Sequence, residues 1–169
     1  MDYLNQDYPI LRGSEEKRIF AVAELLRSTL ECSDSFRMEF DGARLRHVIG
    51  SERMERLMPK YLLIEGKQAV YRYDFYADML DTAKRELLQQ ALSPTVPEGY
   101  AERPLNYIES VRFLDKNGAT ILRGGDHNNF ILFRLPDNVR TSLLTRYHER
   151  GIPDMVVEQM DVDVESLEP

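Results

Sequence analysis

Three apolar segments in the second half of the chain are separated only by short turns. Residues 107–114, 119–122 and 129–135 carry the β-branched and aromatic side chains typical of strands. Asp115-Lys116-Asn117-Gly118 joins the first two segments, and Asn and Gly tolerate the positive φ of a tight hairpin turn. A second turn at 124–128 joins the last two. Strands connected this closely run antiparallel, so the pattern predicts a three-stranded meander.

Earlier segments add further strands to this prediction. Tyr61–Ile64 and Ala69–Phe75 read as a hairpin turned around Gly66. Alternating apolar residues in 36–40 indicate another short strand. The run Phe130–Phe133 is apolar at every position, so we expect a central strand that is buried on both faces.

Helical spacing of apolar residues predicts about three amphipathic helices. Residues 15–31 follow Ser14, a good helix-capping residue, with two glutamates in the first turn. Residues 76–92 repeat the pattern, and a last helix begins with Asp137 as its cap. The charged stretch 43–58 suggests two further short helices.

These elements together predict a single α+β domain, an antiparallel sheet (hairpin plus three-stranded meander) packed against the helices. The chain has 169 residues, which fits one domain, and its single Cys excludes a disulfide framework. We place the domain at 1–153 and treat 154–169 as an acidic C-terminal segment that is strand-like or mobile. No glycine-rich loop precedes a helix, so no nucleotide site is expected.

Charge is concentrated at the C-terminus. The net charge is −7, and the segment 154–169 contributes six acidic residues and no basic one. The remainder holds 22 basic and 23 acidic residues, so the body is nearly neutral. Nucleic acid is therefore an improbable partner, because duplex binding needs a basic surface.

The C-terminal segment also alternates apolar and acidic residues, as an extended strand with two different faces would. Such a strand can cover the protein's own sheet edge or add to a partner's sheet. We predict that it contacts a protein partner, together with arginines of the 43–58 stretch. The predicted contact residues are Met160, Asp161, Val162, Asp163, Val164, Glu165, Arg53 and Arg56.

No residue pattern indicates a metal, a cofactor or a catalytic constellation. The leading hypothesis is a non-enzymatic protein-binding module of inhibitor, immunity, anti-defence or secretion-chaperone type that acts on one protein partner. Its element order, a helix-flanked antiparallel sheet in a small acidic chain, resembles that of the type III secretion chaperones. Exposed strand edges would also allow a homodimer.

The alternative hypothesis is a small-molecule-binding domain or small enzyme with a pocket near His127. That histidine lies in a polar turn beside Asp126, and loops held by strands often carry function. Tyr71 or Tyr73 from the hairpin would complete the site. A concave, partly apolar cavity reaching His127 would favour this hypothesis over protein binding.

Location follows from two absences in the sequence. Apolar runs are at most five residues long, so we expect no membrane span. The first residues lack a basic region followed by an apolar core, so no secretory signal is predicted. These features predict a cytoplasmic protein.

Overall fold

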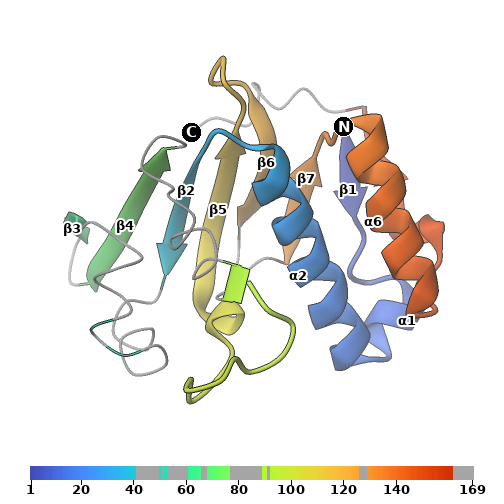
Figure 1. Ribbon diagram of the computed structural model, residues 1–169, viewed down its shortest axis with the longest axis horizontal. Coiled ribbons are helices and arrows are strands. Elements are labelled where there is room, and N and C mark those ends of the chain that lie inside the picture. The colour runs from blue at the N-terminus through green and yellow to red at the C-terminus, as the bar shows by residue number, and fades with distance from the viewer. Residues whose placement is uncertain are drawn as a thin grey trace.

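In the computed structural model of this chain, eight strands among the described residues form one antiparallel sheet, in the order β3-β4-β2-β5-β6-β7-β1-β8 (Figure 1). The structure describes residues 1–40, 50, 52, 61–65, 68–76, 89–90, 92–125 and 129–161, with the backbone alone for 37–40, 61–65 and 68–76. The strands are β1 (Asp2–Leu4), β2 (Ser35–Phe40), β3 (Tyr61–Glu65), β4 (Gln68–Tyr76), β5 (Ile108–Leu114), β6 (Thr120–Gly125), β7 (Phe130–Phe133) and β8 (Val157–Gln159).

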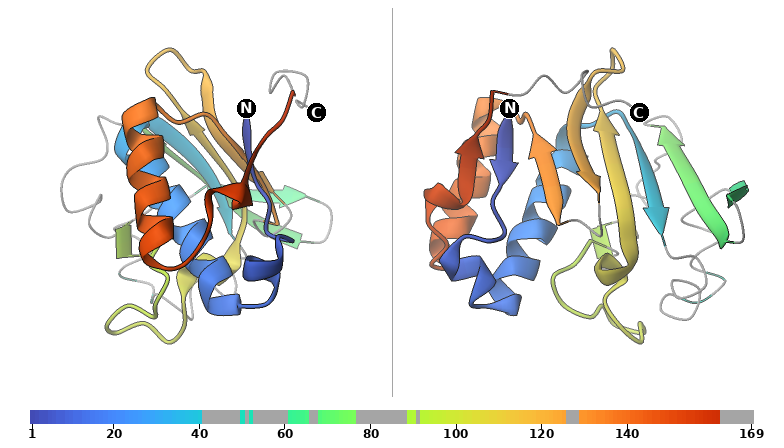
Figure 2. Two further views of the ribbon diagram at one scale, coloured as in Figure 1. Left: turned by 90° about the vertical axis from the view of Figure 1, so that its right-hand side faces the viewer. Right: turned by 180° about the vertical axis from the view of Figure 1, so that it is seen from behind.

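Two long helices lie on one face of this sheet (Figure 1). They are α2 (Glu15–Cys32) and α6 (Asp137–Glu149), and shorter helical segments are α1 (Pro9–Arg12), η2 (Pro104–Tyr107) and η3 (Asp154–Val156). Seen from behind, the strands face the viewer and both long helices lie beyond them (Figure 2). The sheet therefore has one face packed on helices and an outward face turned away from α2 and α6.

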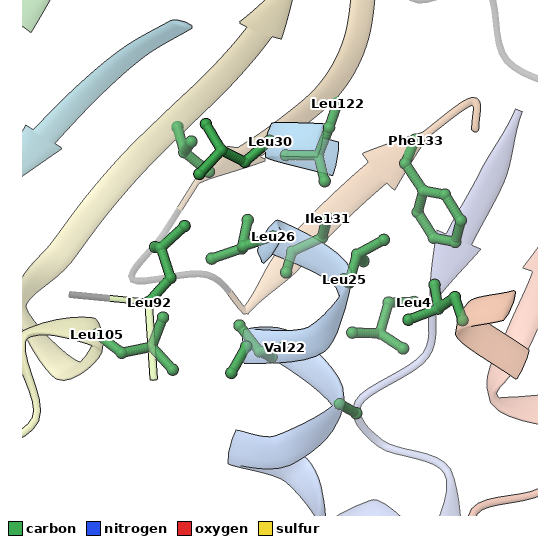
Figure 3. Close-up of a cluster of buried hydrophobic side chains, with 14 of the residues drawn as sticks. Leu4, Val22, Leu25, Leu26, Leu30, Leu92, Leu105, Leu122, Ile131 and Phe133 are labelled. Carbon is green, nitrogen blue, oxygen red and sulfur yellow. The ribbon is translucent and has the colours of Figure 1, made fainter. Parts of the chain in front are cut away.

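The core lies between α2 and the middle of the sheet. Figure 3 shows Leu25 and Leu26 of α2 beside Ile131, and Leu30 near Leu122. All five side chains are buried, as the helical spacing of apolar residues predicts for α2. Each such side chain contributes about 1.5–3 kcal/mol relative to an exposed one.

Capping explains where α2 begins. The Ser14 hydroxyl accepts a hydrogen bond of 3.3 Å from the backbone N–H of Lys17. Glu15 and Glu16 occupy the first turn, where the helix dipole favours negative charge. The predicted helix 15–31 is thus confirmed, with one more residue at its C-terminal end.

The predicted hairpin and the predicted three-stranded meander are both confirmed. β3 pairs antiparallel with β4, and β5, β6 and β7 form the meander. Gly118 has φ of 80° in the turn between β5 and β6. The carboxylate of Asp115 accepts backbone hydrogen bonds of 2.8 and 2.9 Å, from Asn117 and Ala119. The turn is thus held by the side-chain chemistry that its sequence suggests.

The predicted boundaries need corrections at three places. Gly124 and Gly125 belong to β6 and pair with β7 rather than forming the turn, because cross-strand pairing outweighs the turn preference of glycine. Pro136 is the N-cap of α6, so Asp137 is its first helical residue and makes no capping bond. Tyr76 ends β4, and residues 77–88 of the predicted third helix lie outside the described residues, as do 43–49.

The sequence patterns did not predict the N-terminal strand β1, which pairs with the strand formed by the C-terminal segment. β1 lies between β7 and β8. The strand formed by the C-terminal segment is Val157–Gln159, just before the alternating residues that begin at Met160. Residues 162–169 lie outside the described part of the chain.

Candidate functional site

A continuous row of side chains crosses the outward face at right angles to the strands. The register places Arg112 opposite Arg123, Arg123 opposite Leu132, and Leu132 opposite Tyr3. Glu158 of β8 ends the row opposite Tyr3. Their strand neighbours, such as Phe113 and Leu122, belong to the core, so alternation directs this row away from α2 and α6.

One half of the row is basic. Arg112 and Arg123 are cross-strand neighbours, and the backbone register of β2 puts Arg37 opposite Arg112. Asp74 follows opposite Arg37. The Arg112 Nε donates a hydrogen bond of 2.9 Å to Thr120 Oγ1, which orients the guanidinium.

The other half of the row is apolar. The rings of Tyr3 and Phe130 lie 5.7 Å apart, and Phe130 is 38% exposed. Leu132 does not belong to the core cluster and is nevertheless fully buried, so the outward face is not open to solvent at this position. Gly125, opposite Phe130, has open space where a Cβ would stand.

Tyr3 lies between this apolar half and the acidic edge. Partial burial raises the pKa of its hydroxyl, and the carboxylates of Asp7 and Glu158 raise it further. Tyr3 is therefore a neutral hydrogen-bonding group at physiological pH.

Among the described strands, β8 is the outermost on this side of the sheet. Met160 exchanges backbone hydrogen bonds with Met1, and the carbonyl of Val156 accepts one from Asn5. Because backbone groups alternate in direction along an antiparallel strand, those of Val157 and Gln159 point away from β1. These two residues form the outer backbone edge of β8, which we call the β8 edge.

The structure describes only part of the predicted protein-contact set. Met160 and Asp161 follow the β8 edge directly and both are exposed. The other predicted contacts, Val162, Asp163, Val164, Glu165, Arg53 and Arg56, lie outside the described residues. The structure therefore shows the surroundings of only Met160 and Asp161, and contact with a partner stays a prediction for the whole set.

The alternative site is described in part. His127 and Asp126 lie outside the described residues, and Tyr71 and Tyr73 are placed by their backbone in β4. β4 is three strand positions from β6, the strand that ends just before Asp126. Three strand spacings amount to about 14 Å, so the register does not bring these backbones together.

A pocket of about 310 Å³ includes Asn129 in its lining. It lies between the start of α2, η2 and the start of β7, and its apolar floor includes Ile19 and Leu105. Its remaining lining residues are Gln6, Glu15, Arg18, Val22 and Asn106. Five of its eight lining residues are polar or charged, so polar groups dominate this pocket.

Comparison of the chain with protein-family models, with curated protein sequences and with solved structures finds no match. Function must therefore be argued from the geometry of the outward face and its neighbouring features. Among the described helices, none is long and apolar enough to cross a membrane. Among residues 1–40, 92–125 and 129–161, no group of three His, Cys, Asp or Glu side chains could hold a metal ion.

Cys32, the last residue of α2, is half-buried. Its Sγ lies 3.4 Å from the Thr29 carbonyl oxygen. Burial raises the pKa of this thiol, and the charge of Glu31 raises it further. A protonated thiol is a poor nucleophile, so this position supports a structural role for Cys32.

Sequence reasoning missed the outward face. A signal was present in β5 and β6, where Arg112 lies between Val111 and Phe113 and Arg123 follows Leu122. A charged residue between core residues of a strand marks the opposite face. Tyr3 carried no such signal, because its strand depends on pairing with β7 and β8.

Proposed function

We propose that this chain is a non-enzymatic, cytoplasmic protein-binding module that docks one protein partner. An inhibitor, immunity protein, anti-defence factor or secretion chaperone would act in this way. The observation that carries the proposal is the β8 edge, where Val157 and Gln159 direct backbone groups away from the sheet. An extended partner segment can pair with such an edge as an added strand.

The residues around the β8 edge support recognition as well as pairing. Glu158 accepts a hydrogen bond of 2.6 Å from the Asn5 side chain, which fixes its carboxylate beside the edge. Met155 is 63% exposed and Met160 is 37% exposed. Methionine side chains adapt to irregular partner surfaces, so they suit a docking site.

A proline substitution tests the β8 edge without disturbing β1. Gln159→Pro removes an N–H that points outward, while the bonds between Met160 and Met1 remain. Gln159→Thr is the matched control, because it changes the same side chain and keeps the N–H. Circular dichroism should give the same fold and a similar melting temperature for both variants.

Binding is then measured with the purified partner, after its capture from the native host with the tagged wild-type chain. We expect Gln159→Pro to weaken the Kd about tenfold, since one lost interface hydrogen bond costs about 1–1.5 kcal/mol. The Gln159→Thr control should bind within about twofold of wild type. Equal Kd values for the proline and threonine variants would exclude the β8 edge as the contact.

A small-molecule-binding role is the second candidate, favoured by the pocket that Asn129 lines. Asn106 and Asn129 supply amide groups, which orient polar ligands through paired donors and acceptors. A metabolite library screened by thermal shift tests this role. A hit that stabilises wild type but not Asn106→Leu supports it, and a hit that stabilises both equally counts against it.

A further inference from the structure

We propose that a pocket at the start of α2 binds a small monocarboxylate with an aromatic body. The pocket has a volume of about 390 Å³, and small-molecule sites typically measure about 300–1,000 Å³. The first turns of α2, the connector before η2 and the C-terminal end of α6 surround it. This inference goes beyond the proposed protein-binding function, and it concerns neither the β8 edge nor the pocket that Asn129 lines.

Hydrogen bonds hold the walls of this pocket in place. The Lys17 Nζ donates a hydrogen bond of 3.1 Å to the Gly151 carbonyl oxygen, which ties α2 to the end of α6. In the connector, the Thr95 N–H donates a hydrogen bond of 3.2 Å to Ser93 Oγ, and the two hydroxyl oxygens also lie 3.2 Å apart. Figure 1 shows the start of α2 and the end of α6 at the same end of the helix layer. The pocket is therefore largely formed before a ligand binds, as is usual for small-molecule sites.

An aromatic ring forms the apolar part of the pocket. Phe20 is partly buried against the core, and the Arg150 guanidinium carbon lies 4.9 Å from the centroid of its ring. Pro94 adds a second apolar surface from the connector. Aromatic rings pack well against other aromatic rings and against the plane of a guanidinium group. We therefore expect the body of the ligand to be aromatic.

Three cationic side chains, Lys17, Arg103 and Arg150, line the same pocket. The Arg103 side chain is only 26% exposed, and it lies 3.6 Å from the carboxylate of Glu15, which is 72% exposed. A guanidinium withdrawn this far from water gains more from a carboxylate bound through two short hydrogen bonds than from this long contact. Lys17 uses one of its three donors on a backbone carbonyl, and the Arg150 guanidinium makes no ion pair within the described residues. Donors for a bound anion therefore remain on all three side chains.

Two carboxylates limit the charge that the pocket accepts. Glu15 and Glu16 also line it, so three cations against two carboxylates leave one formal positive charge. A monocarboxylate matches this charge, whereas a phosphate dianion or a polyphosphate would be repelled by the glutamates. The planar carboxylate also matches the paired N–H groups of Arg103. These features favour an aromatic monocarboxylate over a phosphorylated ligand.

The test is a titration of the full-length chain with naphthylacetate, followed through the backbone amide signals in two-dimensional NMR spectra. Signals of Lys17, Phe20, Thr95 and Gly151 should move, because these residues lie in the walls of the pocket. Naphthylethanol is the matched control ligand, since it keeps the ring and replaces the carboxylate by a neutral hydroxyl. It should bind at least about tenfold more weakly, because it makes no charge-assisted hydrogen bonds.

Substitutions separate the cation from the ring. Arg103→Gln should weaken the Kd of naphthylacetate about tenfold, because it removes hydrogen bonds to a charged group. Arg103→Lys should recover part of this loss, since it restores the charge without the paired N–H groups. Phe20→Leu keeps the site apolar without a ring and should weaken binding severalfold. Arg134→Gln, at an exposed position after β7, is the control for net charge and should stay within about twofold of wild type. Circular dichroism should give the same fold for all four variants.

Four results would overturn the inference. Naphthylethanol could bind as tightly as naphthylacetate, which would show that the carboxylate is not recognised. Inorganic phosphate could displace the probe at lower concentration, which would indicate a phosphate site. Arg134→Gln could weaken binding as much as Arg103→Gln, which would indicate unspecific attraction. The amide signals could stay unchanged at millimolar naphthylacetate or move only around Asn106 and Asn129, and either result would leave this pocket without the proposed ligand.

Discussion

Met1 and Met160 exchange two backbone hydrogen bonds, of 3.0 Å from the Met1 amino group and 2.8 Å from the Met160 N–H. A segment near the N-terminus and a segment near the C-terminus thus pair as β1 and β8 at one side of the sheet. The C-terminal segment is part of the fold as far as this pair, and its outermost strand is also the proposed contact. Truncated chains that end before or after β8 can therefore distinguish the contribution of β8 to stability from the contribution of later residues to binding.

We therefore compare the melting temperatures of two truncated chains. A chain ending at Asp161 should keep the wild-type melting temperature, because β8 and its bonds to β1 remain. A chain ending at Pro153 loses β8 and the fully buried Val156, whose burial contributes about 1.5–3 kcal/mol. Its melting temperature should fall by at least about 5 °C. Equal melting temperatures for both truncations would contradict the role of β8 in the fold.

An ion-pair cluster joins the two long helices on the covered face. The Glu24 carboxylate lies 3.0 Å from Arg27 and 2.8 Å from Arg146. Arg146 also donates a hydrogen bond of 2.6 Å to the Ser28 hydroxyl. Glu24 is 8% exposed, and its two arginine partners offset the cost of burying the carboxylate.

Glu24→Gln should lower the free energy of unfolding by about 1–2 kcal/mol, less than for a fully buried pair because both arginines are partly exposed. Urea denaturation of Glu24→Gln, Arg146→Gln and the double variant measures the coupling between the two side chains. The double variant should lose less than the sum of the single losses. Strict additivity would show that the pair does not couple.

The buried hydroxyl of Tyr147 should make the free energy of unfolding depend on pH in the alkaline range. Its hydroxyl donates a hydrogen bond of 2.6 Å to the Ala21 carbonyl oxygen. Complete burial raises the pKa of this hydroxyl far above its usual value, and the Glu24 carboxylate raises it further. An unfolded tyrosine loses its proton near pH ~10 while folded Tyr147 keeps it. Its contribution is thus complete below about pH 10 and is lost as the pH rises further.

Tyr147→Phe should therefore cost about 1 kcal/mol at neutral pH and show a smaller loss of stability above about pH 10. Urea unfolding on both sides of this pH measures the difference. Tyr8→Phe, which removes a hydroxyl next to Met155, is the control and should keep the wild-type alkaline loss. Parallel pH profiles for wild type and Tyr147→Phe would contradict the prediction.

A substitution at Gly118 tests how much the positive φ of the hairpin turn matters, without any steric clash. Its φ is 80°, and a Cβ at this position would meet no atom within 4 Å. Gly118→Ala should lower the free energy of unfolding by about 1–2 kcal/mol, the cost of a left-handed conformation for an L-residue. Gly125→Ala is the matched control, since its site is equally open without a positive φ. Similar losses for both variants would point to a cause other than the turn.

Sequence patterns were sufficient wherever neighbouring residues decide the structure. The Asp115–Gly118 turn, the Ser14 cap and the apolar stripe of α2 are local features, and the structure has all three. Alternation in 36–40 and at 61–75 also predicted strands, and short turns made the sheet antiparallel. From these features the sequence alone determined the α+β class.

Tertiary structure decided which strands are neighbours and what each face presents. β2 lies between β4 and β5, and β1 lies between β7 and β8, although these segments are far apart in the chain. The row from Arg112 to Tyr3 and the β8 edge exist only through those pairings. No local pattern encodes them, because pairing between distant strands depends on contacts that form only when the chain folds and packs α2 and α6 against the sheet.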